Sequence, residues 1–130
     1  MLAWRRVALA MSMGAATGAQ APASLCQVPA FRSDGQGGIV EGSMRVSNGG
    51  GPCGIRLWAD VEARRPYATI AVTRAPAHGS VTVTPDGVAY RPDRGYAGPD
   101  IFEMTATGTG RQGAVATGMF RIGVTVVAQP

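Results

Sequence analysis

Turn-forming residues interrupt this sequence too often for long helices. Its 130 residues include 19 glycines and 9 prolines. Between them lie short stretches in which β-branched and other apolar residues alternate with polar ones, which is typical of half-buried strands. These stretches lie at about 39–46, 54–61, 67–74, 80–84, 88–91, 101–107 and 115–127. No segment has the 3.6-residue periodicity of an amphipathic helix, so the sequence predicts an all-β domain.

The clearest local element is the segment 81–90, VTVTPDGVAY. Its apolar residues alternate with polar ones on both sides of a Pro-Asp-Gly turn, which predicts a β-hairpin. Seven short strands with frequent turns together predict a seven-stranded antiparallel β-sandwich. No internal repeat is visible, which indicates one module over residues 39–130.

The N-terminus has the features of an export signal. Arg5 and Arg6 precede an apolar stretch at 7–16 that is too short to span a membrane. The Ala-Gln-Ala motif that ends at Ala21 fits a signal peptidase cleavage site. Residues 1–21 are therefore predicted to be a secretory signal peptide, with an N-terminal anchor helix as the alternative. Cleavage would release a secreted or periplasmic protein with no membrane span.

A loosely ordered lead-in is predicted at 22–38, which is rich in Pro, Gly, Ser and Ala. Cys26 in this segment follows closely behind the signal, as the cysteine of a lipoprotein does. However, Leu25 occupies the position before the cysteine, where the lipobox requires a small residue. Lipidation is therefore not expected.

The charge pattern does not indicate a nucleic-acid partner. All 12 basic residues are arginine, and the two in the predicted signal leave ten to face 8 acidic residues. In the mature chain Arg64 and Arg65 form the only adjacent pair, and aromatic residues are few. The absence of lysine, together with abundant Ala, Gly and Pro, indicates a GC-rich, bacterial genome.

Residues 76–104, PAHGSVTVTPDGVAYRPDRGYAGPDIFEM, contain several motifs in a fixed order. The pattern resembles that of the bacterial immunoglobulin-like, cadherin-like modules of secreted and surface proteins. The matching residues are Pro76, His78, Gly79, Val81, Asp86, Gly87, Tyr90, Pro92, Gly95, Tyr96, Gly98, Asp100 and Phe102. This resemblance implies an immunoglobulin-like β-sandwich. Members of the family usually occur in tandem arrays, as stalks and adhesins, whereas this chain carries one copy.

The end of this segment is predicted to be a structural corner. Gly95 and Gly98 allow backbone turns that other residues disfavour. Asp100 can accept hydrogen bonds from N–H groups at the corner. Phe102 follows on the core side of the next strand, and Tyr96 is expected to pack under the corner and bond to the backbone, as in a tyrosine corner.

A calcium site at Asp93 and Asp100 is the alternative interpretation of the corner. Calcium requires six to eight oxygen ligands, and only two carboxylates converge here. The glycine-rich segment 33–38, SDGQGG, is similar to calcium-binding repeats, but those require stacked copies. No cofactor or metal is therefore expected.

The sequence does not favour an enzyme. A Ser-His-Asp triad would need the single histidine, His78, with Ser80 and Asp86, yet all three belong to one hairpin and no nucleophile elbow is present. One histidine and two distant cysteines do not form a usual zinc ligand set.

The stretch 54–61 places a tryptophan on its polar face. The alternation puts Ile55, Leu57, Ala59 and Val61 on the apolar face. Trp58 is thus expected to point outward beside Arg56. Two interpretations remain open. A loop or the arginine covers the ring, or the two side chains form an interaction patch, since both types are enriched in binding hot spots.

These observations favour a non-catalytic binding or structural module of the bacterial envelope that contacts protein or polysaccharide. The alternatives are a small accessory subunit of a larger complex, which adds its edge strand to a partner's sheet, and a secreted enzyme or inhibitor. The sequence names no ligand and no oligomeric state, because this fold hosts many functions.

The first testable prediction concerns Cys26 and Cys53, the two cysteines of the chain. Both follow the predicted signal, so an exported protein carries them into an oxidising compartment, and we expect one intramolecular disulfide. It differs from the inter-sheet bridge of immunoglobulins, because Met104 stands where that cysteine would fall. The bridge should stabilise the fold by about 3–4 kcal/mol in the chain-entropy model. The oxidised mass should be two hydrogens below the reduced mass; two free thiols in protein from the periplasm would contradict the bridge.

Overall fold

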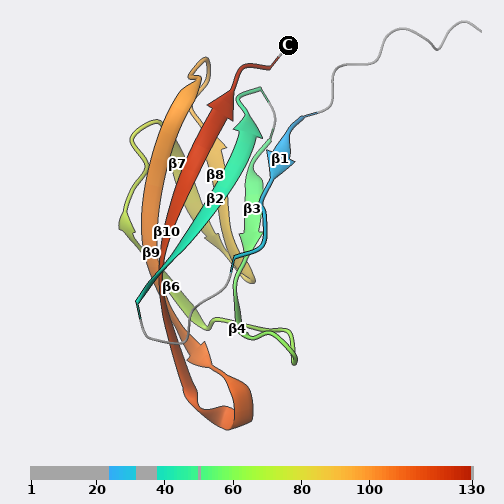
Figure 1. The fold of residues 1–130 in the computed structure, drawn as a ribbon, viewed down its shortest axis with the longest axis vertical. Coiled ribbons are helices and arrows are strands. Elements are labelled where there is room, and N and C mark those ends of the chain that lie inside the picture. Colours follow the sequence, from blue (N-terminus) through green and yellow to red (C-terminus); the bar gives the residue numbers. More distant parts are fainter. Residues whose placement is uncertain (1–23, 32–37, 50, 130) are drawn as a thin grey trace, which may run out of the picture.

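Two layers of β-structure form the body of the molecule in the computed structural model (Figure 1). The structure describes residues 24–31, 38–49 and 51–129. The predicted signal peptide at 1–21 and much of the lead-in at 22–38 lie outside the described residues.

The larger sheet has five strands in the order β1-β2-β10-β9-β6. They are β1 Cys26–Gln27, β2 Ile39–Ser47, β6 Thr69–Arg74, β9 Gly98–Thr109 and β10 Val115–Val127. The smaller sheet, in the order β3-β8-β7, contains β3 Cys53–Arg56, β7 Gly79–Thr84 and β8 Gly87–Pro92. A short pair consists of β4 Trp58–Asp60 and β5 Arg65–Pro66, and the 3-10 turn η2 Arg111–Gly113 joins β9 to β10.

One apolar core lies between the two sheets. Along β9, Phe102, Met104 and Ala106 are buried and the residues between them are more exposed, as the two-residue period of a strand requires. The remaining buried apolar residues are Val40, Met44, Val46, Cys53, Ile55, Leu57, Val88, Tyr90, Phe120, Ile122, Val124 and Val126. The alternation seen in the sequence therefore marks the face that each sheet buries.

The hairpin predicted at 81–90 is confirmed. β7 pairs antiparallel with β8, and Thr84 pairs with Gly87 across the two turn residues Pro85 and Asp86. The turn is reinforced by a hydrogen bond of 3.2 Å from the Thr84 hydroxyl to the Asp86 carboxylate. The prediction of an all-β domain is also confirmed, since the described residues form strands and no α-helix.

The prediction of a fully antiparallel sandwich is wrong at one pair of strands, because β10 pairs with β2 in parallel. Hairpin signals in a sequence report only strands that are neighbours along the chain, and those pair antiparallel. β2 begins the domain in the sequence and β10 ends it, so their relative direction in the sheet depends on the path of the whole chain between them. The count of seven strands is not confirmed either, since the described residues contain ten.

The single strand predicted at 54–61 is also wrong, because the chain leaves the smaller sheet at Leu57. The Leu57 N–H donates to the carbonyl oxygen of Asp86 at 2.9 Å, and the Leu57 carbonyl accepts from Tyr67. β4 then turns back into β5. Val61, expected on the apolar face, lies in that turn and is 71% exposed.

The lead-in is attached to the sandwich near its start. A disulfide joins Cys26 of β1 to Cys53 of β3, with the two Cα atoms 5.6 Å apart. β1 was not predicted as a strand; it pairs with the end of β2. Because β1 and β3 belong to different sheets, the bridge links the two layers at one edge.

The second prediction concerns the close approach of β8 to β3. A Cβ atom added at Gly87 would lie 1.8 Å from the carbonyl oxygen of Ile55. Gly87→Ala therefore forces the two backbones apart and should destabilise the protein by about 1–3 kcal/mol in urea unfolding. Gly51→Ala is the control, because an added Cβ there meets nothing within 4 Å. Equal unfolding midpoints for the two variants would contradict the prediction.

Candidate functional site

Asp100 is the centre of the corner at the start of β9. One of its carboxylate oxygens accepts from the N–H of Ala77 at 2.9 Å and from the N–H of Ile101 at 2.9 Å. The other accepts from the N–H of His78 at 3.1 Å and from the Tyr90 hydroxyl at 2.7 Å. The buried carboxylate thus joins β9 in one sheet to the segments at β7 and β8 in the other.

Tyr96 closes the corner on its outer side. Its hydroxyl donates to the carbonyl oxygen of Pro99, and its ring stacks on that of His78 with centroids 3.9 Å apart. Gly95 and Gly98 have φ angles of 82° and 142°, in the region that favours glycine. Phe102 is fully buried beyond the corner. These contacts describe a structural corner.

The calcium alternative finds no support in this geometry. The two oxygens of Asp100 already accept four hydrogen bonds, and Asp93 is exposed. No group of three or more His, Cys, Asp or Glu side chains that could hold a metal occurs within the described ranges. The glycine-rich segment considered for calcium, 33–38, lies outside them except for Gly38.

The structure does not bring the candidate triad together. His78 precedes β7 and Asp86 follows it, so a six-residue strand, roughly 20 Å long, separates them. The His78 ring stacks on Tyr96, and Asp86 is paired with Arg56 at 3.6 Å. Ser80 is exposed on the strand between them.

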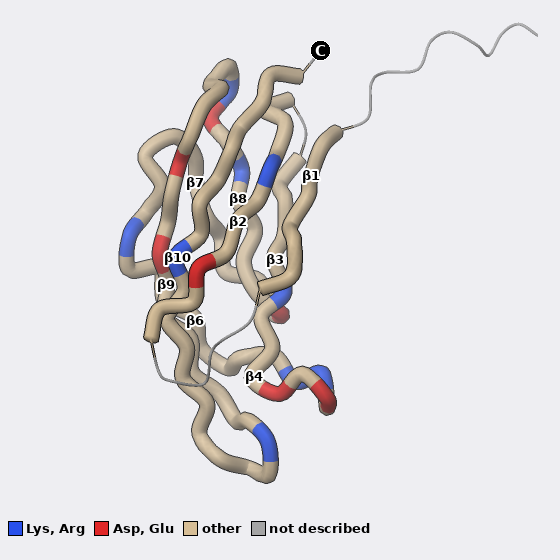
Figure 2. Tube along the Cα trace, in the orientation of Figure 1, with Lys and Arg blue, Asp and Glu red and all other residues tan. Residues whose placement is uncertain are grey.

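The outer face of the larger sheet carries a row of alternating charges rather than a patch of one sign (Figure 2). Arg121 on β10 lies between Glu41 on β2 at 2.9 Å and Glu103 on β9 at 3.1 Å, and Arg74 on β6 lies 3.4 Å from Glu103. The hydrogen bond from Arg121 is the largest cause that holds the pKa of Glu103 below its ordinary value. These charges neutralise one another across four strands.

An apolar hollow lies where the lead-in passes β3 and β4. It is a groove of about 920 Å³ between the two layers. Its apolar lining includes Val28, Phe31, Leu57, Trp58, Tyr67 and Phe120. The ring of Phe120 forms the floor and packs edge-to-face against Phe31 at 6.2 Å and Tyr67 at 6.0 Å.

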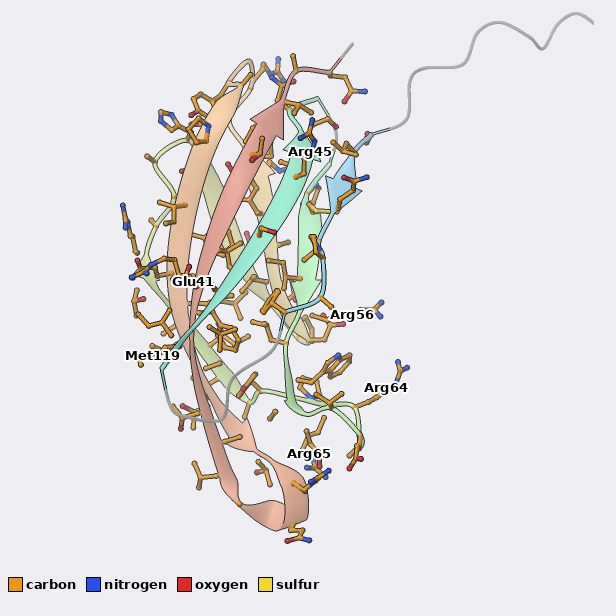
Figure 3. The ribbon with its side chains drawn as sticks, in the orientation of Figure 1. Glu41, Arg45, Arg56, Arg64, Arg65 and Met119 are labelled. Atoms are coloured by element: carbon orange, nitrogen blue, oxygen red, sulfur yellow. A yellow bond between two sulfur atoms is a disulfide. The ribbon has the colours of Figure 1, made fainter. Side chains whose placement is uncertain are left out.

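Trp58, which was expected on the outward face of its strand, is half-buried and lines this groove. The Arg56 side chain is 69% exposed and extends away from the body, toward Asp86 rather than back over the core (Figure 3). The sequence thus identified both residues but missed the groove, because its other walls come from the lead-in and from β10.

Arg65 fixes the position of β4 and hence of Trp58. Its guanidinium contacts the Asp60 carboxylate at 3.4 Å and donates to the carbonyl oxygens of Thr109 and Gly110 at 3.1 and 3.3 Å. The β4–β5 pair is therefore held against the hairpin of β9 and β10.

A family model described as a bacterial Ig domain matches residues 39–123. The matched segment begins at β2, ends within β10 and includes both the corner and the strands β3 and β4. The comparisons with curated proteins and with solved structures gave no match. The match confirms the resemblance that the motifs at 76–104 indicated.

The third prediction concerns Tyr90. Burial first, and then the hydrogen bond to Asp100, raise the pKa of its hydroxyl well above the ordinary value near 10. The folded protein therefore keeps this proton at pH values at which the unfolded chain releases it. The free energy of unfolding should fall as the pH rises above about 10, by up to about 1.4 kcal/mol per pH unit from this residue.

Urea unfolding between about pH 9 and pH 11 measures this slope. Tyr90→Phe cannot lose the proton, so its stability should fall less steeply with pH than that of the wild type. Identical slopes in the two proteins would show that the Tyr90 hydroxyl does not carry the effect.

Proposed function

Because the chain belongs to the bacterial Ig domain family, we propose that it is an exported, non-catalytic binding module of the bacterial envelope. The groove beside Trp58 receives a segment of an envelope protein or polysaccharide. The observation that carries this proposal is a half-buried tryptophan in a largely apolar groove with an exposed arginine at its mouth. Preformed apolar concavities with few polar groups are the usual binding sites of proteins, and tryptophan and arginine dominate binding energy.

Export is supported by the disulfide and by the sequence of the N-terminus. A bridge between Cys26 and Cys53 persists in oxidising compartments such as the periplasm. The charged and apolar segments before Ala21 have the order of a signal peptide. In the part of the chain that the structure describes, no helix has the length and apolar character of a membrane span.

A non-catalytic role is supported by the separation of the polar groups. The one histidine is stacked in the corner, and the buried carboxylate of Asp100 accepts four hydrogen bonds. Neither side chain lines the groove. The groove itself offers apolar contact and positive charge, which suit binding rather than bond cleavage.

The fourth prediction tests the groove as the binding site. Mature protein, residues 22–130, is immobilised and exposed separately to envelope proteins and to protease-treated envelope polysaccharide. The wild type should retain a component of one fraction, and Trp58→Ala should retain it at least about tenfold more weakly, as loss of a hot-spot tryptophan costs ~2 kcal/mol or more.

Arg45→Ala is the matched control, because Arg45 is an exposed residue of β2 that does not line the groove (Figure 3). It should bind like the wild type. Thermal unfolding of each variant verifies that the fold is intact. Equal retention by wild type and Trp58→Ala would exclude the groove as the site.

A further inference from the structure

β3 leaves the backbone groups of one edge unpaired beside the groove, although the lead-in is bonded to Cys53 and lines the same groove. In the smaller sheet it pairs only with β8, and within the described residues no strand pairs with its other side. An unpaired edge presents a row of backbone N–H and C=O groups that can receive another strand. The groove is lined by this same strand, from Gly54 to Arg56.

The direction of the backbone groups identifies which residues of β3 could pair with an added strand. The Leu57 N–H donates to Asp86 at the hairpin turn, and the Ile55 carbonyl lies against Gly87 of β8. N–H and C=O groups of successive residues in a strand point to opposite sides. Gly54 and Arg56 therefore direct their backbone groups away from β8, toward the open edge.

The groove suits a polypeptide better than a sugar chain. A strand that pairs with β3 would place every second side chain toward the space between the layers, where Phe31, Leu57 and Phe120 form apolar walls. Its backbone would hydrogen-bond to Gly54 and Arg56. A polysaccharide would need many polar side chains at the same place, whereas among the described residues of the lining Arg56 alone is charged.

The charge around the groove indicates which peptide fits. Arg56 and Arg64 both extend outward on the side of the molecule where β3 and β4 lie (Figure 3). The carboxylate of Asp86 compensates Arg56 at 3.6 Å, and Arg64 has no ion pair with any described residue. The Asp60 and Glu62 carboxylates of the β4–β5 turn are paired with Arg65 and Arg111, so Arg64 remains as the uncompensated charge of that turn among the described residues. This positive charge favours an acidic residue that flanks the bound strand.

We propose that an extended segment of a partner protein, apolar at alternate positions and flanked by acidic residues, adds to the smaller sheet at β3. This inference rests on the proposed function, of which it names the partner class and the mode of binding. Backbone hydrogen bonds to Gly54 and Arg56 supply the affinity, and the groove selects the side chains, as in other cases of β-strand addition. The chain would then act as a subunit or receptor for a second protein.

The probe is a phage-displayed library of random short peptides, selected on the disulfide-bonded mature protein. Selected peptides should alternate apolar with polar residues and contain flanking Asp or Glu. On binding of a synthetic copy, the amides of Gly54 and Arg56 should shift in ¹⁵N NMR spectra and exchange with deuterium at least about tenfold more slowly. Selected peptides that lack the alternation, or that leave these two amides unshifted, would overturn the proposal.

Gly54 offers a matched pair of variants. Proline removes the N–H that faces the open edge, and proline is tolerated at such edge positions. Alanine keeps the N–H, and a Cβ atom at this position has room, with the Val88 carbonyl oxygen 3.8 Å away. Gly54→Pro should weaken peptide binding at least about tenfold, and Gly54→Ala should change it less than about threefold. Equal weakening by both would argue for simple contact rather than strand addition.

The same experiments distinguish two other possible occupants of the β3 edge and the groove. Concentration-dependent dimers that protect Gly54 and Arg56 without any peptide would assign the edge to a second copy and overturn the proposal. Retention of polysaccharide alone through Trp58 would overturn this inference and leave the proposed function intact. If the mature protein retained neither the envelope proteins nor the envelope polysaccharide, the proposed function itself would be wrong.

Discussion

The carboxylate of Asp100 is the polar contact on which the sandwich depends. It lies at the start of β9 in the larger sheet and accepts hydrogen bonds from the chain entering β7 and from Tyr90 on β8 in the smaller one. A buried carboxylate without donors would be costly, so the three backbone N–H groups and the tyrosine hydroxyl must all be in place together. These contacts therefore fix where the start of β9 lies against β8 and the segment that enters β7. The stacked rings of Tyr90 and Phe102, with centroids 5.8 Å apart, continue the same contact into the apolar core.

The edges of the two sheets differ in how open they are. β6 ends the larger sheet with an irregularity between Val72 and Arg74, which interrupts the regular ladder that another chain would need. β3 has no such irregularity in its pairing, and its open side borders an apolar groove. The unpaired backbone groups of β3 therefore lie beside a preformed groove, which is the arrangement that strand addition requires.

The sequence predicted what depends on neighbours along the chain. Alternation located most strands, the Pro-Asp-Gly turn located the hairpin, and the motifs at 76–104 located the corner. It failed where distant segments decide the outcome. Leu57 continues the apolar pattern of 54–61, yet its N–H bonds to the hairpin turn at Asp86 and the strand ends there. Trp58 could be identified as unusual, but its surroundings could not be predicted, since Phe31 and Phe120 are separated by most of the domain and meet only in the folded structure.

The lead-in gives the groove a wall that is fixed before any partner binds. Ser47 is buried and exchanges two hydrogen bonds with Leu25 of the lead-in. Cys26, which follows Leu25, is tied to Cys53 of β3 by the disulfide. At the other end of the described lead-in, the Phe31 ring packs on Phe120 and covers Gly42, where an added Cβ would lie 2.9 Å from the ring. A segment anchored at both ends loses little further conformational entropy when a ligand enters. The disulfide therefore has a second effect besides stabilising the fold, because it ties the lead-in wall of the groove to β3.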